Sequence, residues 1–330
     1  MTGEAIDLDG IDISGARCYA IPMTTRFRGI AIREGMLIEG TAGWGEFCPF
    51  REYDDREAAA WWATAVEAAT LGWPEPVRDR VPINCTVPAV GPGRAHEIVS
   101  ASGCSTAKVK VSDHPASLGE DLARVEAVRD ALGPHGHIRV DANGRWDIDT
   151  AVAVIPQLDK AASGLQYVEQ PCRTIDELAT VRRKVTVRIA ADESIRRADD
   201  PLRVAVAGAA DIAVIKCTPL GGVRRSLQVA EAAGLPCVVS SALETSVGLA
   251  AGLALAGTLP ELDFACGLGT LSLLHGDVVL DADSLRPAGG YLPVPRTPPA
   301  PDPALLDTYE LTDPESVTWW RARLRRVCFG

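Results

Sequence analysis

Five short apolar runs in the middle of the chain each end in a charged side chain. The charged residues at these ends are Lys110, Asp141, Glu169, Asp192 and Lys216. They are separated by 31, 28, 23 and 24 residues, and each step matches the length of one strand plus one crossover helix. A charge at the end of a buried strand is unfavourable unless it is paired or binds a metal. Five in succession therefore predict a shared site at the mouth of a parallel barrel.

Strand-like and helix-like patterns alternate from residue 82 to residue 285, which indicates βαβ units. Eight strands are predicted, the first at 83–87 and the last two at 238–241 and 264–267. The predicted helices are 118–132, 150–158, 175–183, 201–207, 224–233 and 247–256. A doubly wound sheet alternates in the same way, but it normally binds ligands at one switch point, whereas here successive strands all end in polar groups. The predicted fold class is therefore α/β, with a (β/α)7β TIM-like barrel.

The chain is longer than a barrel requires. A barrel takes roughly 250 residues, so 330 residues leave room for a smaller second domain. The first residues indicate an α+β unit, with strands at 13–23, 30–33 and 36–39, a loop at 24–29 and a helix at 54–70. The predicted organisation is an α+β domain at 1–80, the barrel at 81–290, and a proline-rich linker with a C-terminal helix at 291–330.

Charge and composition argue against several classes of protein. A net charge of -11 provides no basic surface for nucleic acid, and the acidic start of the chain lacks a signal-peptide pattern. The most apolar stretch, 247–259, is too short to span a bilayer. Nine single cysteines without a C-x-x-C pair favour reduced, buried thiols over disulfides or zinc. We expect a cytoplasmic protein that acts on a small molecule without nucleic acid or membrane. Its oligomeric state stays open, and a monomer is compatible with the sequence.

The three acids at strand ends predict a metal site. Asp141, Glu169 and Asp192 come from consecutive strands and should converge at the barrel mouth. Close carboxylates repel one another, and oxygen ligands favour Mg²⁺, with Mn²⁺ as the alternative, over zinc or copper. The other reading is that these acids pair with helix N-termini or arginines, and the nearby lysines count against it.

The lysines predict proton transfer. Lys108 and Lys110 lie two apart on one strand, so both should point into the barrel. Two ammonium groups near a metal should each have a lowered pKa, which would make one a base near neutral pH. Lys216 should approach from the opposite side. This set fits removal of a proton next to a carboxylate whose enediolate form the metal stabilises.

These residues carry a family resemblance. The motifs in order are Thr-Ala-Lys-Val-Lys at 106–110, Asp-Ala-Asn at 141–143, Glu-Gln-Pro at 169–171, Asp-Glu-Ser at 192–194, and Lys216. In this order the chain resembles the enolase superfamily, in its muconate-lactonizing-enzyme-like subgroup. The resemblance implies that the N-terminal α+β domain is a capping domain that closes over the barrel. It also implies that the three acids bind magnesium, that Lys110 and Lys216 are the acid/base residues, and that Lys108 supports Lys110.

Within this subgroup the chain is most similar to the o-succinylbenzoate synthase family, particularly its actinobacterial members. The similar segments are 26–29, 43–47, 216–222 and 240–248. The resemblance implies dehydration of 2-succinyl-6-hydroxy-2,4-cyclohexadiene-1-carboxylate to 2-succinylbenzoate in menaquinone biosynthesis. It also implies that the stretch 240–248 holds the succinyl carboxylate with backbone N–H groups. The substrate-binding candidates are Ser240, Ser241 and Gly267, with Arg26 and Arg28 on a lid over the anionic ligand.

Two other functions stay open. A racemase of N-succinylamino acids or an epimerase of dipeptides would use Lys110 and Lys216 as two bases. Dipeptide epimerases of this superfamily typically carry Asp-x-Asp at the eighth strand end, where this chain has Cys-Gly-Leu-Gly at 266–269. That difference disfavours a cationic substrate but leaves N-succinylamino acids open. A non-catalytic barrel is disfavoured because none of the five charged residues is missing.

Overall fold

The computed structural model describes residues 7–8, 10–114, 116–196 and 202–329. Its centre is a curved sheet of parallel strands in the order β13-β12-β11-β10-β9-β8-β7. The strands are β7 (Cys85–Val87), β8 (Thr106–Lys110), β9 (His137–Asp141), β10 (Leu165–Glu169), β11 (Ile189–Ala191), β12 (Ile212–Ile215) and β13 (Cys237–Val239). A cluster of apolar side chains that includes Tyr167 and Phe264 is buried separately from the main core.

The sheet closes through a very short eighth strand. Cys266 forms a parallel bridge with Ile83, and Gly267 forms one with Ser240. The Gly267 N–H donates to Val239 O at 2.8 Å, so this segment joins both edges of the seven-stranded sheet. The predicted (β/α)7β barrel is therefore confirmed, with an eighth strand shorter than the sequence pattern indicates.

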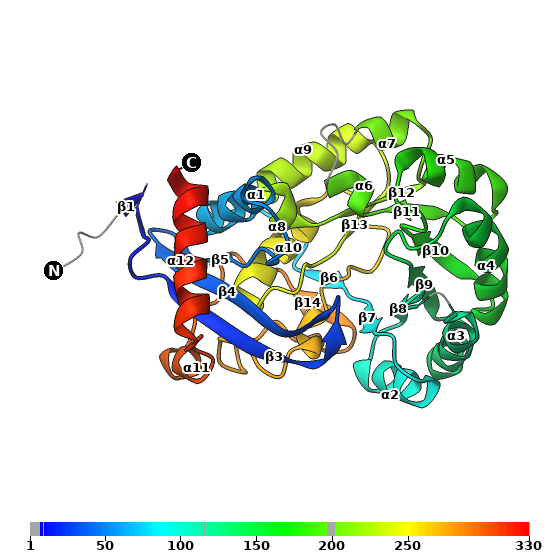
Figure 1. Ribbon diagram of the computed structural model, residues 1–330, viewed down its shortest axis with the longest axis horizontal. Helices are drawn as coiled ribbons and strands as arrows, with labels where there is room; N and C mark the ends of the chain where they lie inside the picture. The colour runs from blue at the N-terminus through cyan, green and yellow to red at the C-terminus, as the bar shows by residue number, and fades with distance from the viewer. Residues whose placement is uncertain (1–6, 9, 115, 197–201, 330) are drawn as a thin grey trace.

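Helices connect the strands, and the longer ones cover the outside of the barrel (Figure 1). They are α2 (Pro92–Ser102), α3 (Leu118–Leu132), α4 (Ile148–Ala161), α5 (Ile175–Lys184), α6 (Glu193–Arg196), α7 (Leu202–Val206), α8 (Cys217–Leu220), α9 (Val223–Ala233) and α10 (Ser246–Thr258). Helix α10 is apolar on all faces because it is buried, which explains the apolar stretch at 247–259. The last residue of the helix predicted at 201–207 belongs to no helix, and the first lies outside the described residues.

An antiparallel sheet forms the N-terminal unit beside the barrel (Figure 1). Its strands are β1 (Asp7–Leu8), β2 (Ile11–Asp12), β3 (Arg17–Phe27), β4 (Ile30–Gly40) and β5 (Gly43–Phe47), followed by α1 (Asp55–Val66) and the π-helical turn η1 (Glu67–Leu71). Asp54 begins α1 by accepting a hydrogen bond from the Glu57 N–H.

Three expectations for this sheet are wrong. The strand predicted at 13–23 begins only at Arg17, because 13–16 form a turn. The strands predicted at 30–33 and 36–39 form one continuous strand that passes through Gly35. A glycine fits at this position because a Cβ atom there would lie 2.6 Å from the Tyr19 hydroxyl oxygen. The segment 24–29 is not a loop: 24–27 extend β3, and only Arg28 and Gly29 turn, both with positive φ as a tight hairpin requires.

The end of the chain returns to the N-terminal sheet. β6 (Arg80–Pro82) pairs with β14 (Tyr291–Pro293), and the remaining helices are η2 (Thr270–Leu273), α11 (Pro303–Thr308) and α12 (Pro314–Phe329). On α12, Trp320 is buried with its ring 6.1 Å from the ring of Phe47, and Arg323 donates to Phe50 O at 3.0 Å. The predicted terminal helix packed by its tryptophans is confirmed, while the exact domain limits stay a prediction.

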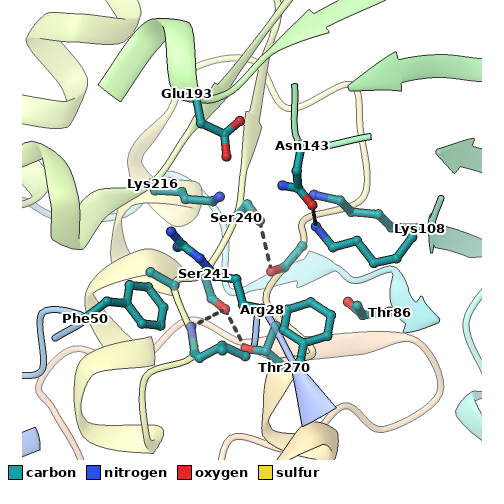
Figure 2. Close-up of a pocket in the computed structure, with 15 residues that line it drawn as sticks. Arg28, Phe50, Thr86, Lys108, Asn143, Glu193, Lys216, Ser240, Ser241 and Thr270 are labelled. Atoms are coloured by element: carbon teal, nitrogen blue, oxygen red, sulfur yellow. Dashed lines mark hydrogen bonds between the residues drawn. The ribbon is translucent and has the colours of Figure 1, made fainter. Parts of the chain in front are cut away.

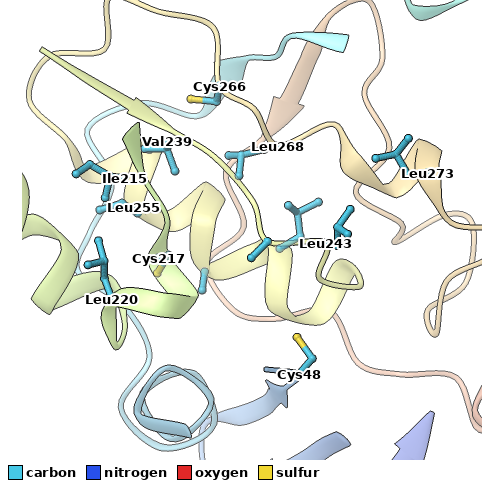
Figure 3. Close-up of a cluster of buried hydrophobic side chains, with 14 of the residues drawn as sticks. Cys48, Ile215, Cys217, Leu220, Val239, Leu243, Leu255, Cys266, Leu268 and Leu273 are labelled. Atoms are coloured by element: carbon cyan, nitrogen blue, oxygen red, sulfur yellow. The ribbon is translucent and has the colours of Figure 1, made fainter. Parts of the chain in front are cut away.

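The barrel and the N-terminal unit share one apolar core. Figure 3 shows Cys48 of the N-terminal unit near Leu243 and other apolar side chains of the barrel. All nine cysteines are free, and seven of them are buried, as expected for reduced thiols that pack as small apolar groups. Among the described helices, none has the length and apolar character needed to cross a membrane.

Candidate active site

The strand register brings the predicted charged residues to one end of the barrel. Lys110 pairs in register with Asp141, and Asp141 with Glu169, so the ends of β8, β9 and β10 are level. Asp192 follows directly after β11, and Lys216 directly after β12. The sheet order β8 to β12 therefore sets these five side chains around the mouth of the barrel, as the sequence predicts.

Ammonium and carboxylate groups alternate in this cluster. Lys108 Nζ lies 2.6 Å from Glu169 Oε1 and 2.9 Å from Asp141 Oδ2. Lys110 Nζ lies 2.5 Å from the same Asp141 oxygen, and Lys216 pairs with Asp192. The three carboxylates are at most 1% exposed, so each charge depends on the neighbouring opposite charges.

The two neighbouring lysines have opposite pKa shifts. Burial lowers the pKa of Lys108, but the carboxylates of Asp141 and Glu169 outweigh burial and raise it well above its usual value. Burial lowers the pKa of Lys110, with Lys108 adding to the effect and Asp141 opposing it. The expectation that both values are lowered is therefore wrong for Lys108, which lies between two carboxylates.

The pKa values of two of the carboxylates are also shifted in opposite directions. Burial raises the pKa of Glu169 to about 7, with a further contribution from the like charge of Asp141. Burial also opposes ionisation of Asp141, but Lys108 and Lys110 outweigh it and lower its pKa.

The donor set suits a hard divalent cation. Asp141, Glu169 and Asp192 supply only carboxylate oxygens, the ligands that Mg²⁺ prefers. Within the described ranges, no three His, Cys, Asp or Glu side chains gather around one point. Instead, the Lys108 ammonium group contacts both Asp141 and Glu169, and this shows that the space between them favours positive charge.

Gln170 orients the loop that carries Asp192, a role that the sequence analysis missed. Its backbone has a left-handed φ of 40°, and its Oε1 accepts hydrogen bonds from Asp192 N at 2.9 Å and Ser194 N at 3.2 Å. Its Nε2 donates to Ser194 Oγ at 2.8 Å and to Cys172 O at 2.9 Å. The Glu-Gln-Pro motif therefore supplies the Glu169 carboxylate of the charged cluster, and its Gln170 holds the segment after β11 through hydrogen bonds.

A pocket opens above the charged cluster, with Lys108 and Lys216 on opposite sides of it (Figure 2). Its lining residues are Phe27, Arg28, Phe50, Thr86, Lys108, Lys110, Asn143, Glu193, Lys216, Ser240, Ser241, Ala242, Leu243, Gly267 and Thr270. The structure thus brings Lys110 and Lys216 to one cavity, as predicted.

The predicted substrate wall lines this pocket with hydroxyl groups rather than backbone N–H groups. Ser240 N donates to Ile215 O, Ser241 N to Gly267 O, and Gly267 N to Val239 O, so these amides are used within the barrel. Ser241 Oγ lies 2.5 Å from Thr270 Oγ1. The expectation of backbone donors in the stretch 240–248 is therefore wrong for Ser240 and Ser241, because the barrel uses their N–H groups.

The β3–β4 hairpin contributes Phe27 and Arg28 to the pocket lining and separates the two predicted arginines. Arg28 lines the pocket with its guanidinium carbon 4.1 Å from the centre of the Phe50 ring. Arg26 is not among the residues that line this pocket but lines a neighbouring outer cavity, and its Nε donates to Gly29 O at 3.1 Å. Phe27 brings its ring to 5.4 Å from Lys110 Nζ, so the hairpin also helps to exclude water from this lysine.

Several lining residues were not predicted as site residues. Asn143 Oδ1 accepts a hydrogen bond from Lys110 Nζ at 2.8 Å, and Glu193 directly follows Asp192. Their places next to predicted metal ligands were the available signal. Thr86, Phe50 and Thr270 carry no local signal, because only the folded barrel brings them to the pocket.

Two protein-family models match the sequence of this chain. The family models described as enolase N-terminal domain-like and enolase C-terminal domain-like match residues 18–69 and 93–298. The second match covers more than half of the chain, and the chain therefore belongs to the enolase superfamily.

Curated proteins show which enzymes of this superfamily the chain is similar to. The chain is 65% identical to the o-succinylbenzoate synthase of Thermobifida fusca, over 85% of this chain and 87% of that protein. It is 50% identical to the o-succinylbenzoate synthase of Mycolicibacterium smegmatis, over 99% and 98%. The structure resembles a dipeptide epimerase from Enterococcus faecalis complexed with Mg and L-Leu-L-Tyr, with a TM-score of 0.72 and 22% identity over 88% of this chain and 98% of that one. At this identity the structural likeness concerns the fold alone.

Replacing Gln170 should destabilise the protein. Gln170→Leu keeps the side-chain volume but removes the acceptor for two buried N–H groups, so we expect the free energy of unfolding to fall by about 2 kcal/mol or more. Urea unfolding followed by circular dichroism measures this change. The control is Gln157→Leu, at an exposed position on α4, which should leave the midpoint nearly unchanged. Equal urea midpoints for the two variants would contradict the stabilising role of the Gln170 hydrogen bonds.

Proposed function

We propose that this chain is an o-succinylbenzoate synthase, a lyase that dehydrates 2-succinyl-6-hydroxy-2,4-cyclohexadiene-1-carboxylate to 2-succinylbenzoate in menaquinone biosynthesis. The observation that carries the proposal is the pocket with Lys110 and Lys216 around a buried carboxylate cluster, in a chain 50% identical to a synthase over 99% of its length. Its partner is accordingly a small carboxylate substrate.

Lys110 is the proposed base. Its lowered pKa makes the neutral amine more accessible than in a free lysine, and its Nζ faces the pocket. The amine takes the proton from the carbon next to the substrate carboxylate. The resulting ammonium then returns that proton to the departing hydroxyl group on the same face. A C–H bond and a C–O bond break, a C=C bond forms, water leaves, and Lys110 is again neutral.

The other two lysines remain charged in this scheme. Lys108 lies two residues from Lys110 on β8, where its ammonium group supplies a positive charge beside the base. Lys216 is paired with Asp192 on the opposite side, where its ammonium group stabilises negative charge on the substrate ring.

A divalent cation completes the proposed site. Asp141, Glu169 and Asp192 would hold Mg²⁺, with Mn²⁺ as the alternative. When bound, the ion would supply Lewis-acid stabilisation of negative charge on the substrate carboxylate. The magnesium in the similar dipeptide epimerase structure supports this choice of ion.

The other carboxylate of the substrate belongs to the succinyl arm. The Ser240 and Ser241 side chains line the pocket, and Arg28 of the β3–β4 hairpin adds a positive charge to the lining (Figure 2). We assign the arm to this region, because hydroxyl and guanidinium donors suit a carboxylate.

One rival function uses the same lysines. An N-succinylamino acid racemase needs bases on both faces of its substrate. Lys110 and Lys216 both line the pocket, and Lys108, on the same strand as Lys110, lies across the pocket from Lys216 (Figure 2). The eighth strand carries Cys266 and Gly267, without the acid that would hold an ammonium group of a dipeptide. Racemisation of N-succinylamino acids is therefore the competing reaction to test, and dipeptide epimerisation is disfavoured.

A comparison of the two reactions tests the proposal directly. The purified protein with Mg²⁺ should dehydrate the hydroxycyclohexadiene substrate with a turnover on the order of 10 s⁻¹, a common value for enzymes. The absorbance of the aromatic product follows this reaction. Racemisation of N-succinylamino acids, followed by deuterium exchange in D₂O for each stereoisomer, should be slower. Faster racemisation than dehydration would refute the synthase assignment.

Removal of the base should stop the reaction without unfolding the protein. We expect Lys110→Ala to lower kcat by about 10³-fold or more, because general-base catalysis typically contributes factors of this size. Lys184→Ala, at an exposed position on α5, should keep the wild-type kcat and serves as the matched control. Circular dichroism checks the fold of both variants. A fully active Lys110→Ala enzyme would rule out the proposed mechanism.

A further inference from the structure

A carboxylate of the N-terminal sheet reaches into the barrel beside the pocket. Glu46, on β5, is 2% exposed. Its Oε2 accepts hydrogen bonds from Thr245 N at 3.1 Å, Thr245 Oγ1 at 2.5 Å and Gly248 N at 2.9 Å. Its Oε1 accepts one from the Tyr19 hydroxyl at 2.5 Å. Glu46 thus satisfies two of the N–H groups at the start of α10, those of Thr245 and Gly248, where a negative charge is favourable.

An arginine of the same sheet holds the residues just before this helix. Arg33, on β4, is also 2% exposed. Its Nε donates to Leu243 O at 2.9 Å, and its Nη2 donates to Ala242 O at 3.3 Å and to Cys48 O at 2.5 Å. The segment 242–248 is therefore held at its carbonyl groups by Arg33 and at its N–H groups by Glu46.

These contacts require a close approach of the two units. A Cβ atom on Gly45 would lie 2.2 Å from Ala65 O, and one on Gly248 would lie 2.8 Å from Glu46 Oε2. Gly45 thus allows β5 to pack against α1, and Gly248 allows Glu46 to approach the start of α10.

The held segment is part of the pocket wall. Ala242 and Leu243 line the pocket directly after Ser240 and Ser241. Leu243 has a φ of 69°, an unfavourable conformation for a residue other than glycine, and the hydrogen bond from Arg33 to its carbonyl helps to hold it there.

Arg33 also contacts another part of the pocket lining. Its guanidinium carbon lies 4.5 Å from the centre of the Phe50 ring, and that of Arg28 lies 4.1 Å from the same ring. The Phe50 ring therefore links Arg33 to the arginine that lines the pocket.

We propose that Glu46 and Arg33 are positioning residues that set the geometry of the pocket wall at 240–243, so that docking of the N-terminal unit determines affinity for the succinyl arm of the substrate. The inference rests on the proposed function, because it assigns the arm to this wall. Neither residue lines the pocket, so both act through the wall.

The chain provides a matched control for this role. Glu67, in η1, is a second buried carboxylate from the N-terminal unit. It accepts hydrogen bonds from Val223 N at 2.5 Å and Arg224 N at 3.2 Å, at the start of α9. None of these residues lines the pocket. Loss of either carboxylate weakens a contact between the two units, but only Glu46 contacts the segment that continues the pocket wall.

Steady-state kinetics of Glu46→Gln and Glu67→Gln test the proposal. Both changes keep the side-chain shape but place an NH₂ group against donors. We expect Glu46→Gln to raise KM about tenfold or more with a much smaller change in kcat, because the lost hydrogen bonds shape the binding wall and not the reacting groups. Glu67→Gln should keep the wild-type KM. Equal KM values for the two variants would overturn the proposal.

Hydrogen exchange separates this inference from the proposed reaction. Peptides that cover 240–248 should exchange faster in Glu46→Gln than in wild type and should be unchanged in Glu67→Gln, whether or not the protein turns over the proposed substrate. Similar exchange in both variants would overturn the positioning role. If Glu46→Gln does not fold, Arg33→Lys provides the same test, because it keeps the charge but loses the forked donors. Arg33→Lys should also raise KM and speed exchange at 240–248, and unchanged values would overturn the proposal.

Discussion

The structure depends on the placement of three lysines and three carboxylates at the buried mouth of the barrel. Lys108 contacts both Asp141 and Glu169, Lys110 shares Asp141, and Lys216 pairs with Asp192. A buried charge without a partner is strongly unfavourable, so these residues can be buried only together. The level register of β8, β9 and β10 is what brings them together.

This charged cluster indicates proton transfer, and the other residues that line the pocket determine which substrate can bind. Buried carboxylates with lysines on opposite sides suit removal of a proton next to a carboxylate, which serves dehydration and racemisation alike. The hydroxyl groups and Arg28 that line the pocket suit a second carboxylate on the substrate. The absence of an acid at Cys266 and Gly267 disfavours a substrate with an ammonium group. The walls in turn depend on the N-terminal unit, which holds the segment 242–248 through Arg33 and Glu46.

Much of the barrel follows from local pattern. The helix predicted at 118–132 coincides with α3, and the charged strand ends lie where the spacing predicts. Features that depend on contacts distant in sequence could not be predicted. The pKa shift of Lys108 depends on its distances to two acids on other strands. The hydrogen bonds of Gln170 depend on its distance to the end of the next strand. The role of Glu46 depends on how the N-terminal unit packs against the barrel. The strand break expected near residue 35 was wrong because the sequence does not reveal that Tyr19 packs against Gly35.

The proposed metal site is the central claim, and X-ray diffraction at the manganese absorption edge tests it most directly. Crystals grown with Mn²⁺ in place of Mg²⁺ report the ion through its anomalous signal. We expect one strong anomalous peak contacted by oxygen atoms of Asp141, Glu169 and Asp192, with the Lys108 ammonium group displaced from between Asp141 and Glu169. A peak bound elsewhere, or no peak with Lys108 still paired to both acids, would contradict the account.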